Sequence, residues 1–248
     1  MSIRLAWFIF LGLHALPVAA GLRLGWGAGL VCMFFLHAVM LVSIFVPRLD
    51  PWRSTLRTFR TTEKQVCITI DDGPTADTDE ILSSLDDAGA RAVFFVIGER
   101  ITGRCAEIVR RGHVLGNHTQ THPSGWFWCY SPGAQRREIE RASRVIRETT
   151  GVTVQLFRPP VGFRNLFNAP VLKTLGLRNI GWSARGFDAT DTNVDRVLRR
   201  ILRRLEPGAI ILLHQGKPHH AILLRGLLAE LKSGGWAAVI PPELRMPG

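Results

Sequence analysis

The sequence predicts an α/β domain built on a parallel sheet, preceded by two apolar N-terminal segments, and three observations lead to this prediction. Beyond residue 63, strand-like and helix-like stretches alternate along the chain. The strand-like stretches are near-continuous apolar runs, which is typical of strands covered by helices on both faces. Ionisable residues end these stretches, and the carboxyl ends of parallel strands are where sites collect. An open sheet and a closed barrel both fit this pattern.

The first 47 residues contain two apolar segments, 3–20 and 24–46. Each is long enough to cross a hydrocarbon core of about 30 Å, the first only barely. The first segment also fits a cleaved signal peptide, with a short basic start and small residues at Val18 and Ala20. We therefore expect one or two transmembrane helices, with segment 24–46 as the stronger span.

Residues 48–63 form a basic stretch that we expect to be a juxtamembrane linker on anionic headgroups. Only Arg23 lies between the two apolar segments, whereas the second is followed by Arg48, Arg53, Arg57, Arg60 and Lys64. Cytoplasmic flanks carry the excess of Lys and Arg. The charges therefore place the protein in the inner (cytoplasmic) membrane, with its domain on the cytoplasmic face.

The net charge of +11 comes from basic residues spread along the whole chain. With no recognition motif beside them, we expect anionic lipids and not nucleic acid as partners. The four cysteines have no metal-site spacing, and we interpret them as free thiols in a reducing compartment. The sequence does not indicate an oligomeric state.

The domain is expected to span residues 64–248. Its strands are predicted at 65–70, 91–97, 113–118, 154–160, 178–184, 208–215 and 236–242. Its helices are predicted at 77–89, 99–111, 134–151, 168–176, 193–205 and 219–232. Gly89 and Gly151 end two of these helices, and helix 134–151 carries an apolar stripe.

Ionisable residues at the strand ends should meet in one mouth: Asp71 and Asp72, His118, Arg158, Arg185 with Asp188, and His214. His118 and His122 are four residues apart, so on one helical turn they would face the same way. With one carboxylate they would bind a divalent ion and leave positions open for water and substrate.

Five motifs in this order resemble those of the polysaccharide deacetylase family, the NodB-homology domain of carbohydrate esterases. They are TIDDGP (69–74), HTQTH (118–122), RPPVG (158–162), WSARGFD (182–188) and LLH (212–214). The resemblance implies a distorted (β/α)₇ barrel, preceded here by the transmembrane segments. It implies a metal-dependent hydrolase that removes an N-acetyl group from an amino sugar of a polysaccharide. The anchoring segments and the basic charge also favour a lipid-linked glycan as substrate.

The resemblance also implies a role for each matching residue. Asp71 is the general base and His214 the general acid, while Arg158 orients the base and is itself held by Asp188. A backbone N–H near Val161 stabilises the oxyanion. The metal ligands are Asp72, His118 and His122. Zinc is the expected ion, with Co²⁺, Mn²⁺ and Ni²⁺ as alternatives.

Ile70 stands where the first motif usually has Phe, and four further positions depart from the family pattern. Val161 replaces an aromatic residue, Arg185 stands where many members have an acid, Ala189 where many have Trp, and Gln215 where Asp is frequent. These changes affect the neighbours of the site and leave all five central side chains in place.

The loop 124–133 is dense in aromatic residues. We expect either a hydrophobic plug under the barrel rim or a lip on which Trp126 and Trp128 contact sugar or membrane. Two other functions stay open: a deformylase or O-acetyl esterase using the same residues, and a non-catalytic carbohydrate-binding or assembly partner.

Overall fold

The computed structural model describes residues 1–46, 49–50 and 54–245. Its helices are α1 (Ile3–Leu24), α2 (Trp26–Phe45), α3 (Thr78–Asp87), α4 (Arg104–Arg110), α5 (Pro132–Thr150), α6 (Asn168–Thr174), α7 (Val194–Leu202) and α8 (Pro218–Ser233). Its strands are β1 (Thr55–Leu56), β2 (Gln65–Gly73), β3 (Ala92–Val96), β4 (Val114–Asn117), β5 (Leu156–Phe157), β6 (Arg178–Ile180), β7 (Ala184–Arg185), β8 (Ala209–His214) and β9 (Ala237–Ala238). The predicted α/β alternation is confirmed.

The named strands pair in parallel in the order β1-β6-β5-β4-β3-β2-β8-β7, with β9 beside the start of β2. The predicted single strand 178–184 is two strands, because the chain leaves β1 and β5 by Ile180 and joins β8 at Ala184. This one segment therefore connects both ends of a curled sheet. The expected distorted barrel is confirmed, in the form of a curled parallel half-barrel behind two apolar helices.

Side chains alternate between two buried clusters along β2. Val66, Ile68 and Ile70 belong to the layer between the sheet and its helices. Cys67 belongs to the inner cluster with Val93 and other residues of the concave face. Because successive strand residues point to opposite faces, Thr69 and Asp71 follow Cys67 toward the inside. Thr69 and Asp71 therefore belong to the floor of the site, at the end of the barrel interior where the strands finish.

Three predicted elements are much shorter in the structure. The helix expected at 99–111 is interrupted, since the N–H groups of Gly98 and Glu99 donate to Thr119 and Gln120 and a 3₁₀ turn replaces the first turn. Strand 154–160 ends at Phe157, before two prolines. The last strand, expected at 236–242, ends at Ala238, and Pro241 and Pro242 further along lack the N–H that a ladder needs.

Part of the expected linker belongs to the sheet. Residues 55–56 form β1 against β6, and Phe59 is buried in the inner cluster. Asp50, just upstream, accepts from the backbone N–H of Thr55 and forms an ion pair with Arg164 at 3.3 Å. The positions of residues 48 and 51–53 lie outside the described residues.

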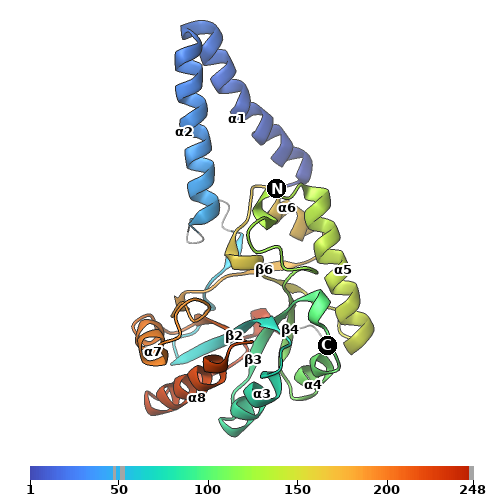
Figure 1. The fold of residues 1–248 in the computed structure, drawn as a ribbon, viewed down its shortest axis with the longest axis vertical. Coiled ribbons are helices and arrows are strands. Elements are labelled where there is room, and N and C mark those ends of the chain that lie inside the picture. Colours follow the sequence, from blue (N-terminus) through green and yellow to red (C-terminus); the bar gives the residue numbers. More distant parts are fainter. Residues whose placement is uncertain (47–48, 51–53, 246–248) are drawn as a thin grey trace.

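Helices α1 and α2 form a hairpin that stands above the domain and opens toward it (Figure 1). Both are long and apolar enough to cross a membrane. Their side chains are mostly exposed, for example Phe8 at 80%, Leu30 at 72% and Phe34 at 69%. A soluble domain's core helix would be mostly buried, so these helices suggest a membrane anchor or a signal segment.

Candidate active site

The two adjacent carboxylates at the end of β2 separate at a strand irregularity. The register shifts between Ile70 and Gly73, and Asp72 has a left-handed backbone with φ of 70°. Asp71 stays in register with His214 of β8 and is 3% exposed. The irregularity re-aims one carboxylate while its neighbour remains in the ladder, so the two can have different partners.

His118 and His122 lie on an irregular loop after β4, not on the helical turn that their spacing suggested. Thr119 and His122 have φ values of 70° and 53°, so the segment cannot continue as a helix. The loop is fixed by its own hydrogen bonds: the N–H of Thr119 donates to Asn117, and that of His122 to the Thr119 hydroxyl. Both imidazoles still face Asp72, as predicted.

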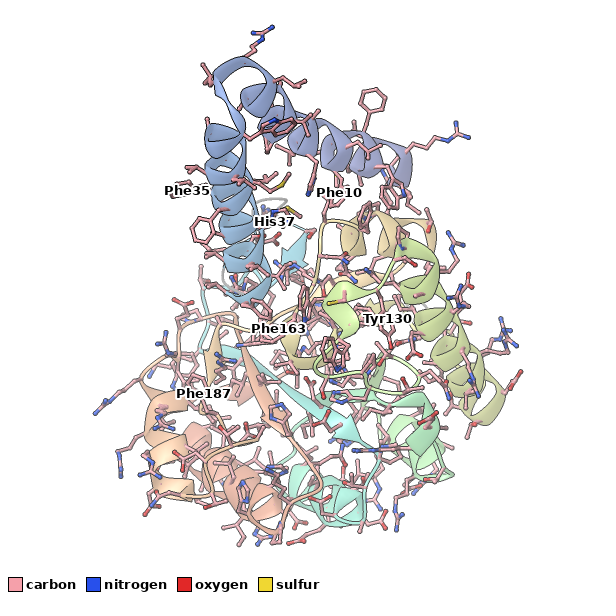
Figure 2. All side chains as sticks on the ribbon, turned by 45° about the horizontal axis from the view of Figure 1, so that its top comes forward. Phe10, Phe35, His37, Tyr130, Phe163 and Phe187 are labelled. Carbon is pink, nitrogen blue, oxygen red and sulfur yellow. The ribbon has the colours of Figure 1, made fainter. Side chains whose placement is uncertain are left out.

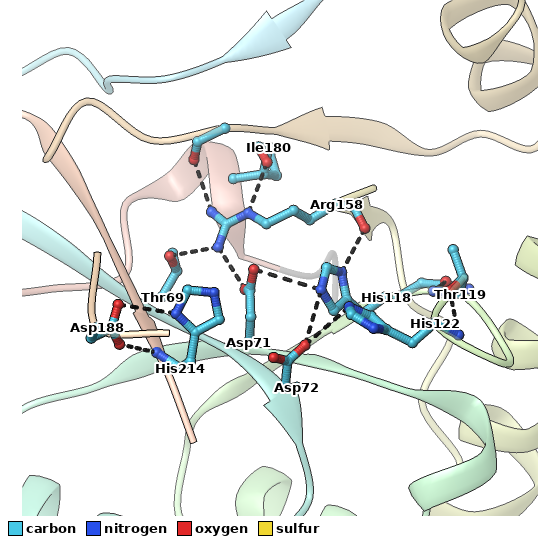
Figure 3. A network of polar contacts seen from close by, with 12 residues as sticks. Thr69, Asp71, Asp72, His118, Thr119, His122, Arg158, Ile180, Asp188 and His214 are labelled. Atoms are coloured by element: carbon cyan, nitrogen blue, oxygen red, sulfur yellow. Dashed lines mark hydrogen bonds and ion pairs between the residues drawn. The ribbon is translucent and has the colours of Figure 1, made fainter. Parts of the chain in front are cut away.

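Asp72, His118 and His122 form a cluster that fits one divalent cation. Oδ1 of Asp72 lies 3.5 Å from Nε2 of His118 and 3.1 Å from Nε2 of His122 (Figure 3). Nδ1 of His118 lies 2.7 Å from the carbonyl oxygen of Arg158, which only accepts, so this nitrogen carries the proton and Nε2 presents a lone pair.

Oδ1 of Asp72 is buried and has no hydrogen-bond donor among the described residues. One ligand atom from each residue lies within 4.8 Å of the others. A carboxylate oxygen and two imidazole nitrogens in this position can hold one cation between them, and the ligand set suits a divalent metal.

Arg158 is fully buried and holds Asp71. Its Nη1 donates to Oδ1 of Asp71 at 2.7 Å and to the Thr69 hydroxyl at 2.8 Å. Nε and Nη2 donate to the carbonyl oxygens of Ile180 and Gly181. With Oδ1 occupied, Oδ2 of Asp71 faces the metal-ligand cluster, 3.7 Å from Nε2 of His118.

Asp188 binds His214 and not Arg158, which corrects the expected partner. Its Oδ1 lies 3.0 Å from Nδ1 of His214, and its Oδ2 accepts from the His214 backbone N–H at 2.7 Å. Burial lowers the pKa of His214, but the Asp188 hydrogen bond and the charges of Asp188, Asp71 and Asp72 outweigh it and raise the pKa to about 9. Arg158 uses carbonyl oxygens instead because β6 ends beside it.

Asp191, the other acid after the fourth motif, forms ion pairs with Arg196 and Arg200 at 2.7 Å each. It therefore takes no part in the network around His214. Gln215 accepts hydrogen bonds from the hydroxyls of Thr75 and Thr78, so its side chain ties β8 to the start of α3.

The predicted catalytic and metal-ligating side chains line one cleft of about 490 Å³, except Arg158, which lies beneath it. Val161 is also in the lining, on a 3₁₀ turn with φ of 59°. The described non-glycine residues with positive φ are Asp72, Thr119, His122, Val161 and Phe187, and all lie in or beside this cleft. Such backbone costs about 1–3 kcal/mol per residue and clusters at functional sites.

Trp126 and Trp128 are not among the described residues that line the cleft. Trp126 is 69% exposed, and the ring of Trp128 lies 5.1 Å from that of Phe45 in α2. Between them Phe127 is buried against Phe157, as expected of a plug. The contact of the two tryptophans with substrate stays a prediction.

Sequence reasoning missed the aromatic residues that do line the cleft: Phe45, Phe163, Trp182 and Phe187. Figure 2 shows Phe163 below the end of α2, and Phe187 on the segment between β7 and α7. Trp182 and Phe187 belong to the WSARGFD motif, so this motif could have indicated two of the four lining residues. Phe45 had no signal, because an apolar residue at the end of an apolar helix indicates nothing about a pocket.

Comparison with known proteins agrees with this geometry. A family profile described as polysaccharide deacetylase matches residues 59–180. A chitooligosaccharide deacetylase of a Bradyrhizobium species is 35% identical over 62% of this chain and 72% of its own length. A peptidoglycan-N-acetylglucosamine deacetylase of Listeria monocytogenes is 30% identical over 74% of this chain, which spans only 39% of that relative.

Among solved structures, a CE4-family pseudoenzyme from Bacillus anthracis superposes with a TM-score of 0.71. It is 26% identical over 79% of this chain and 69% of its own. The similarity covers the domain that carries the described cleft. The chain belongs to the polysaccharide deacetylase family, with the NodB-homology fold of CE4 carbohydrate esterases.

Proposed function

We propose that this protein is a metal-dependent hydrolase that removes the N-acetyl group from an amino sugar. The observation that carries the proposal is the convergence of Asp72, His118 and His122 beside Oδ2 of Asp71, the oxygen that Arg158 does not bind. Two relatives named as deacetylases of chitooligosaccharides and of peptidoglycan N-acetylglucosamine support an N-acetylated amino sugar as substrate. Because one structural neighbour is a pseudoenzyme, the fold alone would not support catalysis.

Zn²⁺ is the proposed ion, since two imidazoles and one carboxylate form a common open zinc site. Such an ion lowers the pKa of water and polarises a carbonyl. Oδ2 of Asp71 takes the proton from the attacking water, while Arg158 fixes the carboxylate through Oδ1. Protonated His214, oriented through Nδ1 by Asp188, donates from Nε2 to the departing amine. The backbone N–H near Val161 is the proposed donor to the oxyanion.

We further propose that α1 and α2 anchor the protein in the inner membrane with the domain on the cytoplasmic face. The exposed apolar helices and the excess of basic residues after α2 support this. Contacts of α1 with the domain, including the ring of Trp7 at 4.6 Å from that of Phe167, support a retained helix over a cleaved signal.

The test is acetate release from N-acetylchitooligosaccharides by the full chain in detergent, with and without Zn²⁺. The proposal expects turnover that is lost on chelation and restored by the ion, with acetate and a product in which an N-acetyl group has become a free amine. Co²⁺, Mn²⁺ and Ni²⁺ are compared in the same assay. A protein that binds the glycan without turnover, or that acts only on N-formyl or O-acetyl sugars, would contradict it.

A further inference from the structure

We propose that the substrate is an amino sugar carried on a membrane lipid through a phosphate, and that the end of α2 forms part of its binding cleft. This inference rests on the proposed function and narrows its substrate class. Two features of the cleft carry it: a wall residue supplied by the apolar hairpin, and a guanidinium group among the lining residues.

The wall residue is Phe45, the last residue of α2. It lines the same cleft as Asp72 and His214. Its ring centroid lies 5.0 Å from that of Phe163 at an interplanar angle of 90°, and 5.1 Å from that of Trp128. The apolar helix thus ends against the site itself, with no spacer between them.

The chain beyond α2 is also held close to the site. The backbone carbonyl of Leu49 accepts a hydrogen bond from Arg164, which forms an ion pair with Asp50 as well. Arg164 belongs to the same loop as Val161 and Phe163. The helix end and the segment after it are therefore both attached to the loop that forms one side of the cleft.

The other helix of the hairpin contacts the domain independently. The rings of Trp7 and Phe10 lie 4.6 Å and 6.0 Å from that of Phe167. Figure 2 shows Phe10 and His37 between the two helices, above the domain. Two attachments fix the orientation of the domain under the hairpin, which a flexible tether would not do.

This placement sets where the cleft lies relative to a bilayer. An apolar helix of 20 residues spans the hydrocarbon core, so its last residue lies at the interface. Phe45 would therefore bring the cleft to the level of the headgroups. A sugar attached to a lipid is held at this level, whereas a distant polymer has to reach it.

Arg185 supplies the charge that selects the lipid's linkage. Its guanidinium stacks over Phe187 at 4.1 Å and lies 5.4 Å from the ring of Trp182, and the residue lines the cleft. Arginine stacks on aromatic faces and binds phosphate through paired N–H groups. An N-acetylhexosamine is neutral, so a cation in this wall favours a substrate that carries a phosphate beside the sugar.

The experiment compares three substrates with the full chain in lipid nanodiscs loaded with Zn²⁺. They are N-acetylglucosamine on a polyprenyl phosphate, N-acetylglucosamine 1-phosphate without a lipid, and N-acetylchitotetraose. Mass spectrometry follows the loss of the acetyl group. We expect kcat/KM to be about tenfold or more higher for the lipid phosphate than for either soluble substrate. Apolar burial supplies the difference from the free sugar phosphate, and the charge-assisted contact adds to it in the comparison with chitotetraose.

Two variants separate the contributions. Phe45→Ala should lower kcat/KM on the lipid phosphate by a larger factor than on the free sugar phosphate. Arg185→Gln should lower it on both phosphates by a larger factor than on chitotetraose. Phe35→Ala, an exposed position of α2, and Arg199→Gln, an exposed position of α7, are matched controls outside the cleft. Bound zinc equal to that of the parent protein shows that each variant is folded.

The outcomes are distinct. Highest kcat/KM on chitotetraose, with Phe45→Ala and Arg185→Gln affecting all substrates equally, overturns this inference and leaves the deacetylase function intact. Highest kcat/KM on the free sugar phosphate supports the phosphate contact but overturns the lipid as its source. No turnover of any of the three substrates overturns the proposed function, and this inference with it.

Discussion

His214 and Asp188 are joined twice: the imidazole Nδ1 lies 3.0 Å from one carboxylate oxygen, and the His214 backbone N–H donates to the other at 2.7 Å. The double contact fixes both the ring and the strand end that carries it. It leaves Nε2 as the imidazole nitrogen that can reach a substrate. The neighbouring acids also raise the pKa of His214 to about 9, so this imidazole stays protonated well above the ordinary pKa of histidine.

Asp188→Asn should move the alkaline limb of the kcat profile to lower pH. The folded protein holds the pKa of His214 at about 9, above its ordinary value, so the acid form is lost only as pH rises through that value. Removing the carboxylate removes the largest of the contributions that raise this pKa, so the acid form is lost at lower pH. The measurement is kcat between pH 6 and 10.

Asp191→Asn is the matched control for this profile, because Asp191 pairs with Arg196 and Arg200 and not with His214. Its alkaline limb should coincide with that of the parent protein. Superimposable profiles for Asp188→Asn and the parent would contradict the assigned role of Asp188.

The identity of the central residues could be predicted from the sequence, whereas their second contacts could not. Asp71, Asp72, His118, His122 and His214 follow strands or a strand-end loop, and a parallel sheet brings such ends together. The partner of Asp188 depends on how the chain turns between β7 and α7, in a loop where Phe187 has a positive φ. Local patterns do not determine such backbone.

Arg158→Met should strongly destabilise the protein. The change removes the cation beside Asp71, a residue that is 3% exposed, and leaves the charge of its carboxylate uncompensated. Breaking a buried pair in this way costs about 3–5 kcal/mol, equivalent to roughly 10 °C in Tm for a domain of this size. Thermal unfolding in detergent measures it.

Arg136→Gln provides the comparison for Arg158→Met, since the Arg136–Glu140 pair is exposed and 3.3 Å long. Such exposed pairs contribute about 0–1 kcal/mol to the free energy of unfolding, so the Tm of Arg136→Gln should differ little from that of the parent protein. Equal shifts in Tm for the two variants would show that Arg158 is not a structural cation.

Phe127→Ala should lower Tm far more than Trp126→Ala. Phe127 is 1% exposed and packs with Phe157 and Val171, whereas Trp126 is 69% exposed. Removing a buried phenyl ring costs about 3–5 kcal/mol, and an exposed side chain away from the core costs little. The same thermal scans compare the two, and a larger loss for Trp126→Ala would mean that the loop packs differently.

Cys129 offers a test of membrane orientation. It is exposed, while Cys67 and Cys105 are buried and burial raises their pKa values to about 12 and 11. A thiol that stays protonated reacts slowly with maleimides. A membrane-impermeant maleimide should therefore label Cys129 in inverted vesicles and not in intact spheroplasts, with Cys129→Ser as the control. Cys32 in α2 is exposed as well, so only labelling that Cys129→Ser abolishes is counted. Such labelling in spheroplasts would place the domain outside the cytoplasm.

The sequence predicts the helices and strands that have strong hydrophobic periodicity. It does not predict those whose limits depend on pairing between strands far apart in the chain. Helix α5 and strand β2 agree with their predicted ranges to within a few residues. The division of 178–185 into β6 and β7 depends on contacts with β5 and β8 that lie far apart in the sequence. The pairing of residues 55–56 with β6 could not be predicted for the same reason, since these residues lie in a basic stretch that resembles a linker.

The most direct test of the central claim measures bound metal and acetate release on the same preparations of the parent protein, Asp71→Asn and His118→Ala. The account predicts about one divalent ion per chain in the parent. It predicts that Asp71→Asn keeps this ion while turnover falls by about 100-fold or more, as expected for loss of a general base. His118→Ala should lose both ion and turnover. Full turnover in Asp71→Asn, or an unchanged metal content and activity in His118→Ala, would contradict the account.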